Sequence, residues 1–180
     1  MNEMTTQARM VARRRVPIDD GRWVMIRPIE RSDASGLSDF YASLSPESRR
    51  RRFLGSAPRL DGDVLRAFAD EGEGFVGILS ERGPRDGAVV AHASVQSVGG
   101  GEAEIAFAVA DELQGRGIGR QLMPMALELA QARGLRTATA TLLAENVPMR
   151  RLVQRAGRSI VADHLDAGVE EITLSLTPAA

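Results

Sequence analysis

The fold depends most clearly on the stretch Gln114-Gly115-Arg116-Gly117-Ile118-Gly119-Arg120. An apolar segment of strand type precedes it, and after Gly117 apolar residues recur every three to four positions, which is typical of an amphipathic helix. Glycines at such a junction let backbone N–H groups approach an anion, and the first helical turn adds unpaired N–H groups and a positive dipole end. The stretch therefore predicts a pyrophosphate site, and a glycine-rich turn that merely starts a helix is the alternative.

Two other kinds of phosphate loop are excluded by the same stretch. The Walker spacing with its Lys-Ser/Thr is absent, and G-x-G-x-x-G would require glycine in place of Arg120 or Leu122. Nucleotide hydrolysis and dinucleotide binding therefore do not fit.

Upstream of the loop, the sequence predicts strands at 75–80, 88–98 and 103–109, paired antiparallel through glycine-rich turns at 83–87 and 99–101. A strand at 22–29 comes earlier. Ser32 is the predicted N-cap of a helix that runs to Leu44, Pro46 opens a second helix, and a third covers 63–69. Residues 1–15 are polar, carry Arg13 to Arg15 and predict a flexible tail.

Downstream, the long helix is expected to end near Gly134 and to kink at Pro124. A strand at 137–143, a helix at 147–156 and a strand at 169–176 follow, with a possible further strand near 158–162. This order predicts one α/β domain over residues 16–178. Its mixed, mostly antiparallel sheet has six to seven strands, flanked by about four or five helices.

Composition narrows the classes of function. The chain has 180 residues, 43% of them apolar, and a net charge of −1, so it carries no overall field to attract nucleic acid or an anionic membrane. It has no cysteine, which excludes disulfides, thiolate metal sites and a cysteine nucleophile. His92 and His164 lack the spaced partners of a metal site, so no metal is expected. Without a spanning run or a secretory signal, we expect a cytoplasmic protein.

The loop resembles the acyl-CoA signature Q/R-x-x-G-x-G/A of the GNAT superfamily of N-acetyltransferases, through Gln114, Gly117 and Gly119. The resemblance covers residues 22–176 and includes an Asn that leads a short helix, here Asn146. The segment 44–53 is similar to bacterial protein lysine acetyltransferases of the Pat type. The resemblance implies a GNAT fold, acetyl-CoA as acyl donor and direct transfer to an amine.

It also implies which residues bind the coenzyme. Backbone N–H groups around Val109 would polarise the thioester carbonyl, the amides of 114–119 would hold the pyrophosphate, and Asn146 would contact the coenzyme arm. The full predicted set is Phe107, Val109, Gln114, Gly115, Arg116, Gly117, Ile118, Gly119, Arg120, Asn146 and Met149.

Glu104 is the predicted general base. It shares one strand face with the small residues Ala106 and Ala108, where a cleft can reach its carboxylate. An alkyl ammonium, with a pKa near 10.4, must lose a proton before it attacks, and a carboxylate can accept that proton. Pat-like domains have their catalytic Glu in a similar stretch. Glu102 lies on the same face and is the rival, and a solvated strand residue is the other interpretation of Glu104.

Two features stay open at this stage. The relatives' tyrosine general acid has no counterpart after Asn146, because the only tyrosine is Tyr41. The run Arg49 to Arg52 suits a solvated helix face, an acidic protein acceptor, a coenzyme phosphate or RNA, although aromatics are only 4% of the chain and provide no stacking platform for RNA.

The predicted function is N-acetyl transfer from acetyl-CoA to a primary amine, with a protein lysine preferred. The alternatives are a small-molecule amine acetyltransferase, a noncatalytic acyl-CoA sensor and a nucleic-acid-binding domain that uses its arginines. Either a monomer or a homodimer is compatible with the sequence.

Overall fold

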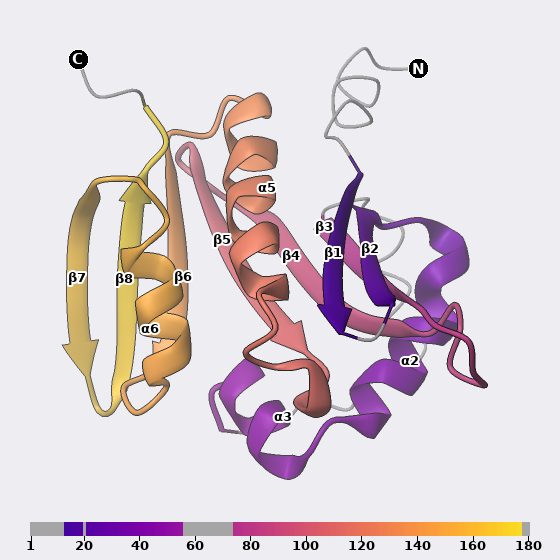
Figure 1. Ribbon diagram of the computed structural model, residues 1–180. Coiled ribbons are helices and arrows are strands. Elements are labelled where there is room, and N and C mark those ends of the chain that lie inside the picture. The colour runs from indigo at the N-terminus through magenta and orange to yellow at the C-terminus, as the bar shows by residue number, and fades with distance from the viewer. Residues whose placement is uncertain (1–12, 20, 56–73, 178–180) are drawn as a thin grey trace.

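The computed structural model of the protein describes residues 13–19, 21–55 and 74–177. One eight-stranded sheet runs through them in the order β1-β2-β3-β4-β5-β6-β8-β7 (Figure 1). All neighbouring strands are antiparallel except β5 and β6, which are parallel. The strands are β1 (Arg14–Asp19), β2 (Arg22–Pro28), β3 (Gly74–Ser80), β4 (Val89–Gly99), β5 (Glu102–Val109), β6 (Thr137–Leu143), β7 (Ile160–Asp166) and β8 (Val169–Ser175).

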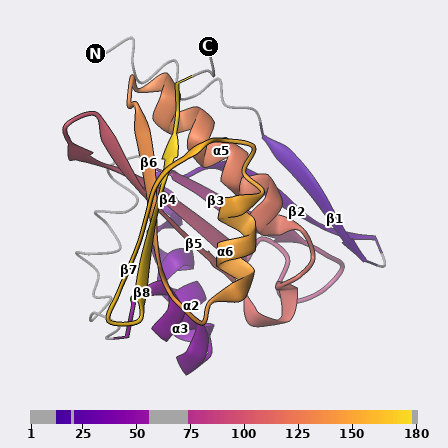
Figure 2. The ribbon, with the colours of Figure 1, turned by 90° about the vertical axis from the view of Figure 1, so that its left-hand side faces the viewer.

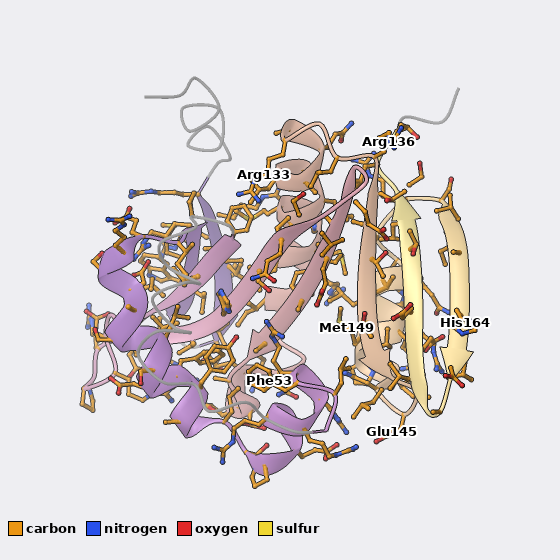
Figure 3. All side chains as sticks on the ribbon, turned by 180° about the vertical axis from the view of Figure 1, so that it is seen from behind. Phe53, Arg133, Arg136, Glu145, Met149 and His164 are labelled. Atoms are coloured by element: carbon orange, nitrogen blue, oxygen red, sulfur yellow. The ribbon has the colours of Figure 1, made fainter. Side chains whose placement is uncertain are left out.

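Helices cover both faces of this sheet. On one face lie α5 (Ile118–Ala132), which packs on β3, β4 and β5, and α6 (Val147–Gln154), which packs on β6 (Figures 1 and 2). On the other lie α2 (Ala34–Ser43), against β4, and α3 (Pro46–Arg52), against β5 and β6 (Figure 3). Short 3-10 turns occupy η1 (Arg31–Asp33) and η2 (Asp111–Leu113). The predicted mixed, mostly antiparallel α/β sheet is confirmed.

The eighth strand is β1, which the sequence did not predict. It begins at Arg14, inside the stretch expected to be a tail. The strand is held against β2 by Val16, which is buried opposite Val24. Two of the tail's arginines also have partners: Arg14 pairs with Glu128 at 3.2 Å, and Arg15 lies 4.3 Å from the ring centroid of Trp23. With Val16 as its single buried residue, β1 lacks the alternation of apolar and polar residues by which a strand is detected from sequence.

The long helix α5 follows its prediction closely. Ile118, Leu122, Met125 and Leu129 are buried on one face, each contributing about 1.5 to 3 kcal/mol of hydrophobic free energy. Gly134 adopts a φ of +75° just after the helix, as a C-terminal glycine does. The helix continues through Pro124, and the expected kink stays a prediction.

The first helices differ from the prediction in one detail. Ser32 is not the N-cap of α2: it lies within η1, and Asp33 is the N-cap residue. The carboxylate of Asp33 instead accepts the N–H of Glu30 at 2.8 Å and pairs with Arg27 at 2.6 Å. α3 begins at Pro46 as predicted, and Ser45 is its N-cap, whose Oγ accepts the N–H of Ser48 at 3.1 Å. The helix predicted at 63–69 lies outside the described residues.

Among the described residues no helix has the length and apolarity needed to cross a membrane. Cytoplasmic residence and oligomeric state stay predictions.

Candidate active site

The parallel pair of β5 and β6 is very short. Only three residue pairs join the strands, the last being Glu104 with Thr139. Yet β5 continues to Val109 and β6 continues to Leu143, so the two strands separate beyond that pair. A cavity of about 280 Å³ lies at this opening, lined by residues 106–109 of β5 and by Thr141 and Leu142 of β6. An extended acyl-thioester arm can therefore insert between two strand edges.

The glycine-rich loop lies at the mouth of the cavity, and its glycines serve different purposes. Gly115 and Gly117 have φ angles of +75° and +87°, which are unfavourable for residues with a side chain. These two glycines turn the chain into α5 and leave the first amides of the helix exposed to the cavity. A Cβ on Gly119 would lie 3.3 Å from the Leu152 side chain, so this glycine allows α6 to pack closely on α5.

The cavity is lined by every predicted coenzyme residue except Arg116, namely Phe107, Val109, Gln114, Gly115, Gly117, Ile118, Gly119, Arg120, Asn146 and Met149. Arg116 lies elsewhere, with its Nη1 3.6 Å from Oδ2 of Asp19 at the end of β1. Its side chain therefore holds β1 near the loop.

The Gln114 side chain ties the loop to neighbouring elements. Its Nε2 donates to Oγ of Ser48 in α3 at 3.0 Å and to the carbonyl of Val109 at 3.2 Å. The sequence predicted this residue as part of the phosphate seat, whereas its amide group joins α3 to the end of β5. The predicted pyrophosphate role of the loop's backbone amides stays a prediction.

Asp111 completes this connection, and sequence reasoning missed it. Its carboxylate accepts the N–H and Oγ–H of Ser45 at 3.0 and 2.7 Å and the Oγ–H of Ser48 at 2.6 Å. Burial acts to raise the pKa of Asp111, but these hydrogen bonds outweigh it and lower the pKa below its usual value. The start of α3 is thus fastened to the segment between β5 and the glycine loop.

Asn146 and Met149 form the opposite side of the cavity. Oδ1 of Asn146 accepts the N–H of Met149 at 3.3 Å, so Asn146 is the N-cap of α6, and Pro148 lies in the first turn. Figure 3 shows Met149 between β5 and β6 when the molecule is seen from the α2 and α3 side. The predicted Asn-led helix is confirmed, and its first turn faces the cavity.

Glu104 lies at the point where β5 and β6 separate. Its side chain is exposed, on the strand face that also carries Ala106 and Ala108, and both alanines line the cavity. Glu104 itself does not line it. The rival Glu102 accepts a hydrogen bond from Oγ1 of Thr139 at 2.7 Å and lies farther from the opening. The two carboxylates therefore differ in position and in hydrogen bonding.

A buried polar cluster lies on the same sheet face, between β4 and helices α2 and α3. The Tyr41 hydroxyl is 2.7 Å from Nδ1 of His92, and Nη2 of Arg52 donates to Oγ of Ser94 at 3.2 Å. Burial, followed by the positive charge of Arg52, lowers the pKa of His92 to about 3, and burial raises the pKa of Tyr41. His92 is therefore neutral at physiological pH.

The predicted arginine run divides between two environments. Arg50 forms exposed ion pairs with Glu47 and Glu145 on both sides of the opening. Arg51 and Arg52 line the cavity. No group of His, Cys, Asp or Glu within the described ranges is arranged to hold a metal ion.

Residues 37–157 match the sequence model of the Acetyltransferase (GNAT) family. The chain belongs to this family. An acetyltransferase of Pseudomonas aeruginosa is 31% identical to this GNAT protein over 140 residues, which are 75% of the chain and 74% of that relative. The acetyltransferase Pat of Mycolicibacterium smegmatis is 29% identical over 160 residues, 87% of this chain and 47% of Pat. The GNAT chain thus spans about half the length of Pat.

A solved structure agrees with these relatives. The GNAT domain of S. lividans PAT superposes with a TM-score of 0.74 at 28% identity, covering 91% of this chain and 96% of that one. The GNAT fold, the resemblance to Pat-type domains and the acetyltransferase class are thereby confirmed. GNAT acetyltransferases are acyl-CoA-dependent N-acyltransferases, so acetyl-CoA is the donor substrate of this enzyme.

Proposed function

We propose that this GNAT enzyme acetylates a primary amine, a protein lysine in preference to a small molecule, with Glu104 as general base. The observation that supports this most is the exposed position of Glu104 at the last paired residue before β5 and β6 separate. Ala106 lies two residues further along the strand, a step of about 6.8 Å, so the carboxylate can reach an amine at the rim directly or through one water.

The reaction begins with loss of a proton from the acceptor ammonium to Glu104. The amine nitrogen then attacks the thioester carbonyl carbon, forming the N–C bond and a negative oxygen. Backbone N–H groups near Val109 would stabilise that oxygen. The N–H of Ala110 is not one of them, because it donates to the carbonyl of Val90 at 2.8 Å. Collapse of the intermediate breaks the C–S bond and releases the coenzyme thiolate, and the nitrogen loses its remaining excess proton to solvent as the amide forms.

Tyr41 does not suit the role of general acid for that thiolate. It is buried, contacts His92 and is not among the residues that line the cavity. The thiolate therefore takes its proton from a group other than a tyrosine.

The preference for a protein lysine rests on the similarity to Pat and to the GNAT domain of PAT. The chain itself simplifies the test, because it contains no lysine: its Lys+Arg total of 23 consists of arginines alone. Any Nε-acetyl-lysine in an assay must therefore come from the acceptor.

The test compares Glu104→Gln with the matched variant Glu102→Gln. We expect Glu104→Gln to lower kcat by about a hundredfold or more, since general-base catalysis contributes roughly that much, and to leave the coenzyme dissociation constant unchanged. Glu102→Gln should retain most of its turnover. Thiol release from acetyl-CoA is measured with a lysine-containing protein panel and a panel of small amines, and mass spectrometry identifies the acetylated product.

Equal losses in the two variants would contradict the choice of Glu104. Turnover on small amines without acetyl-lysine on any protein would identify a small-molecule acetyltransferase. Tight acetyl-CoA binding without turnover on either panel would favour the noncatalytic sensor.

A further inference from the structure

Arg52, the last residue of α3, is a half-buried cation that lacks an anionic partner in the described part of the chain. Its Nη2 donates to Oγ of Ser94 at 3.2 Å, and its Nε is buried without an acceptor among the described residues. The preceding Arg50 and Arg51 both pair with Glu47. No carboxylate within the described ranges pairs with Arg52, although burial makes an uncompensated charge costly. Its guanidinium therefore keeps charge and N–H donors for a ligand.

The groups beside Arg52 do not neutralise it. Phe53 offers only its ring, whose centroid is 5.1 Å from the guanidinium carbon, on the sheet side that α2 and α3 cover (Figure 3). Burial and the charge of Arg52 lower the pKa of His92 to about 3, and burial raises the pKa of Tyr41 although Arg52 opposes that rise. His92 and Tyr41 are therefore both uncharged at physiological pH. An anionic group of a bound molecule would supply the missing charge.

Arg52 lines the cavity between β5 and β6, on the side away from the glycine loop. Ser48, one turn earlier in α3, is the residue that contacts Gln114 of that loop. Arg52 instead reaches Ser94 of β4, which lies directly opposite Ala106 of β5. An anion at Arg52 is therefore distinct from the pyrophosphate that we expect at the glycine loop.

The pairing of β4 with β5 sets the spacing between Arg52 and Glu104. Ser94, the partner of Arg52, pairs with Ala106, and Gln96, two residues along β4, pairs with Glu104. Residues two apart on a strand share a face and are about 7 Å apart. Arg52 is thus anchored one such step from Glu104, over the same face of the sheet. An acceptor whose amine lies at Glu104 can place a nearby group against Arg52.

We propose that Arg52 is a specificity-determining residue that binds a carboxylate of the acceptor, so that the enzyme selects amines with a carboxylate close to the reacting nitrogen. The proposal deepens the proposed function and rests on it. A guanidinium binds a carboxylate through charge-assisted hydrogen bonds in a planar fork. Two kinds of acceptor carry this chemistry. One is a protein lysine with an acidic side chain beside it, and the other is a free amino acid with its own carboxylate.

The experiment uses two pairs of acceptors that differ in the carboxylate. One pair is a lysine peptide with blocked termini and an Asp next to the lysine, and the same peptide with Asn in place of the Asp. The other pair is free lysine and cadaverine, which is lysine without its carboxylate. The proteins are the wild type, Arg52→Gln and the control Arg49→Gln, which alters the same helix at a residue that does not line the cavity. Thiol release from acetyl-CoA gives kcat and KM for each acceptor, and calorimetry with CoA verifies that each variant is folded.

We expect the wild type to favour the carboxylate-bearing member of one pair by about tenfold or more in kcat/KM, as charge-assisted hydrogen bonds imply. Arg52→Gln should raise KM for that member and reduce the ratio within the pair to about one, and Arg49→Gln should keep the wild-type ratio. A preference within the peptide pair identifies a protein lysine beside an acidic residue. A preference for lysine over cadaverine identifies a small amino acid.

Equal use of both members of each pair by the wild type would overturn the proposal and leave the proposed function intact. The proposal would also fail if Arg52→Gln lost activity equally on both members of a pair, because the arginine would then have a structural role. Loss of the preference in Arg49→Gln as well would assign it to the overall charge of α3. Binding of CoA by the wild type without turnover on any of the four acceptors would contradict the proposed function itself.

Discussion

The two walls of the active-site opening are built in different ways. The coenzyme wall, residues 114–120 with the start of α6, comes mostly from one consecutive stretch and presents backbone amides. The other wall, which we call the acceptor wall, consists of α3, whose Arg52 lines the cavity, and of the buried cluster behind it in which Tyr41 of α2 contacts His92 of β4, so it brings together residues distant in sequence. The first wall can be recognised from a local motif, whereas the second exists only once the sheet has formed.

The acceptor wall should be part of the protein's stability core. Tyr41→Ala removes a fully buried ring and leaves His92 without its hydroxyl partner, so the free energy of unfolding should fall by about 3 to 5 kcal/mol. Tyr41→Phe removes only the hydroxyl and should cost about 1 to 2 kcal/mol. Urea denaturation measures both. Equal effects of the two variants would show that ring packing contributes little.

The coenzyme wall should instead depend on backbone conformation. Gly117→Ala strains a position with a φ of +87°, at a cost of about 1 to 2 kcal/mol, and should displace the loop amides enough to weaken CoA binding about tenfold. Gly134→Ala is the matched control, because its φ of +75° lies at the far end of α5. It should lose similar stability and keep full affinity. Calorimetry with CoA would contradict the prediction if both variants bound equally.

Acidification should lower the free energy of unfolding through His92, at pH values above those at which the carboxylates become protonated. The pKa of His92 is about 3 in the folded protein, against an ordinary value near 6.5 in the unfolded chain. The unfolded state therefore binds more protons between these values, and stability must fall as the pH drops below about 6.5. The slope should approach about 1.4 kcal/mol per pH unit near pH 5.

Urea denaturation between pH 7 and 5 measures this slope. His92→Gln should abolish it, and His164→Gln, on the exposed strand β7, should retain it. A slope that survives in His92→Gln would assign the effect to another group.

The smallest effect concerns the link between the walls. Asp111→Ala should lower stability by about 1 kcal/mol or less, because the hydrogen bonds to Ser45 and Ser48 are exposed. Its main consequence should appear in hydrogen exchange. CoA should protect the α3 amides in the wild type and protect them less in the variant. Identical protection would show that the coenzyme loop and α3 respond independently.

These differences explain which features the sequence could predict. The order of strands and helices follows from apolar periods and glycine turns, and the glycine loop follows from consecutive residues. The sequence missed β1 because only Val16 marks its buried face. It missed Asp111 because a lone acidic residue has no local pattern, and its partners lie 63 and 66 positions away. The place of Arg116 in the motif does not reveal that its side chain pairs with Asp19 and that the residue does not line the cavity.

The short β5–β6 pair also bears on how the chain folds. β7 and β8 are joined by a tight turn at Ala167 and Gly168, and β8 pairs with β6, so these three strands form a unit of nearby residues. They join the other five through only three residue pairs, which require the whole α5 crossover to be in position. Contacts that need such long loop closures form late. We expect two strand groups to form first and to dock afterwards, so the last pair of strands to join during folding is the one where we propose that the acetyl donor binds.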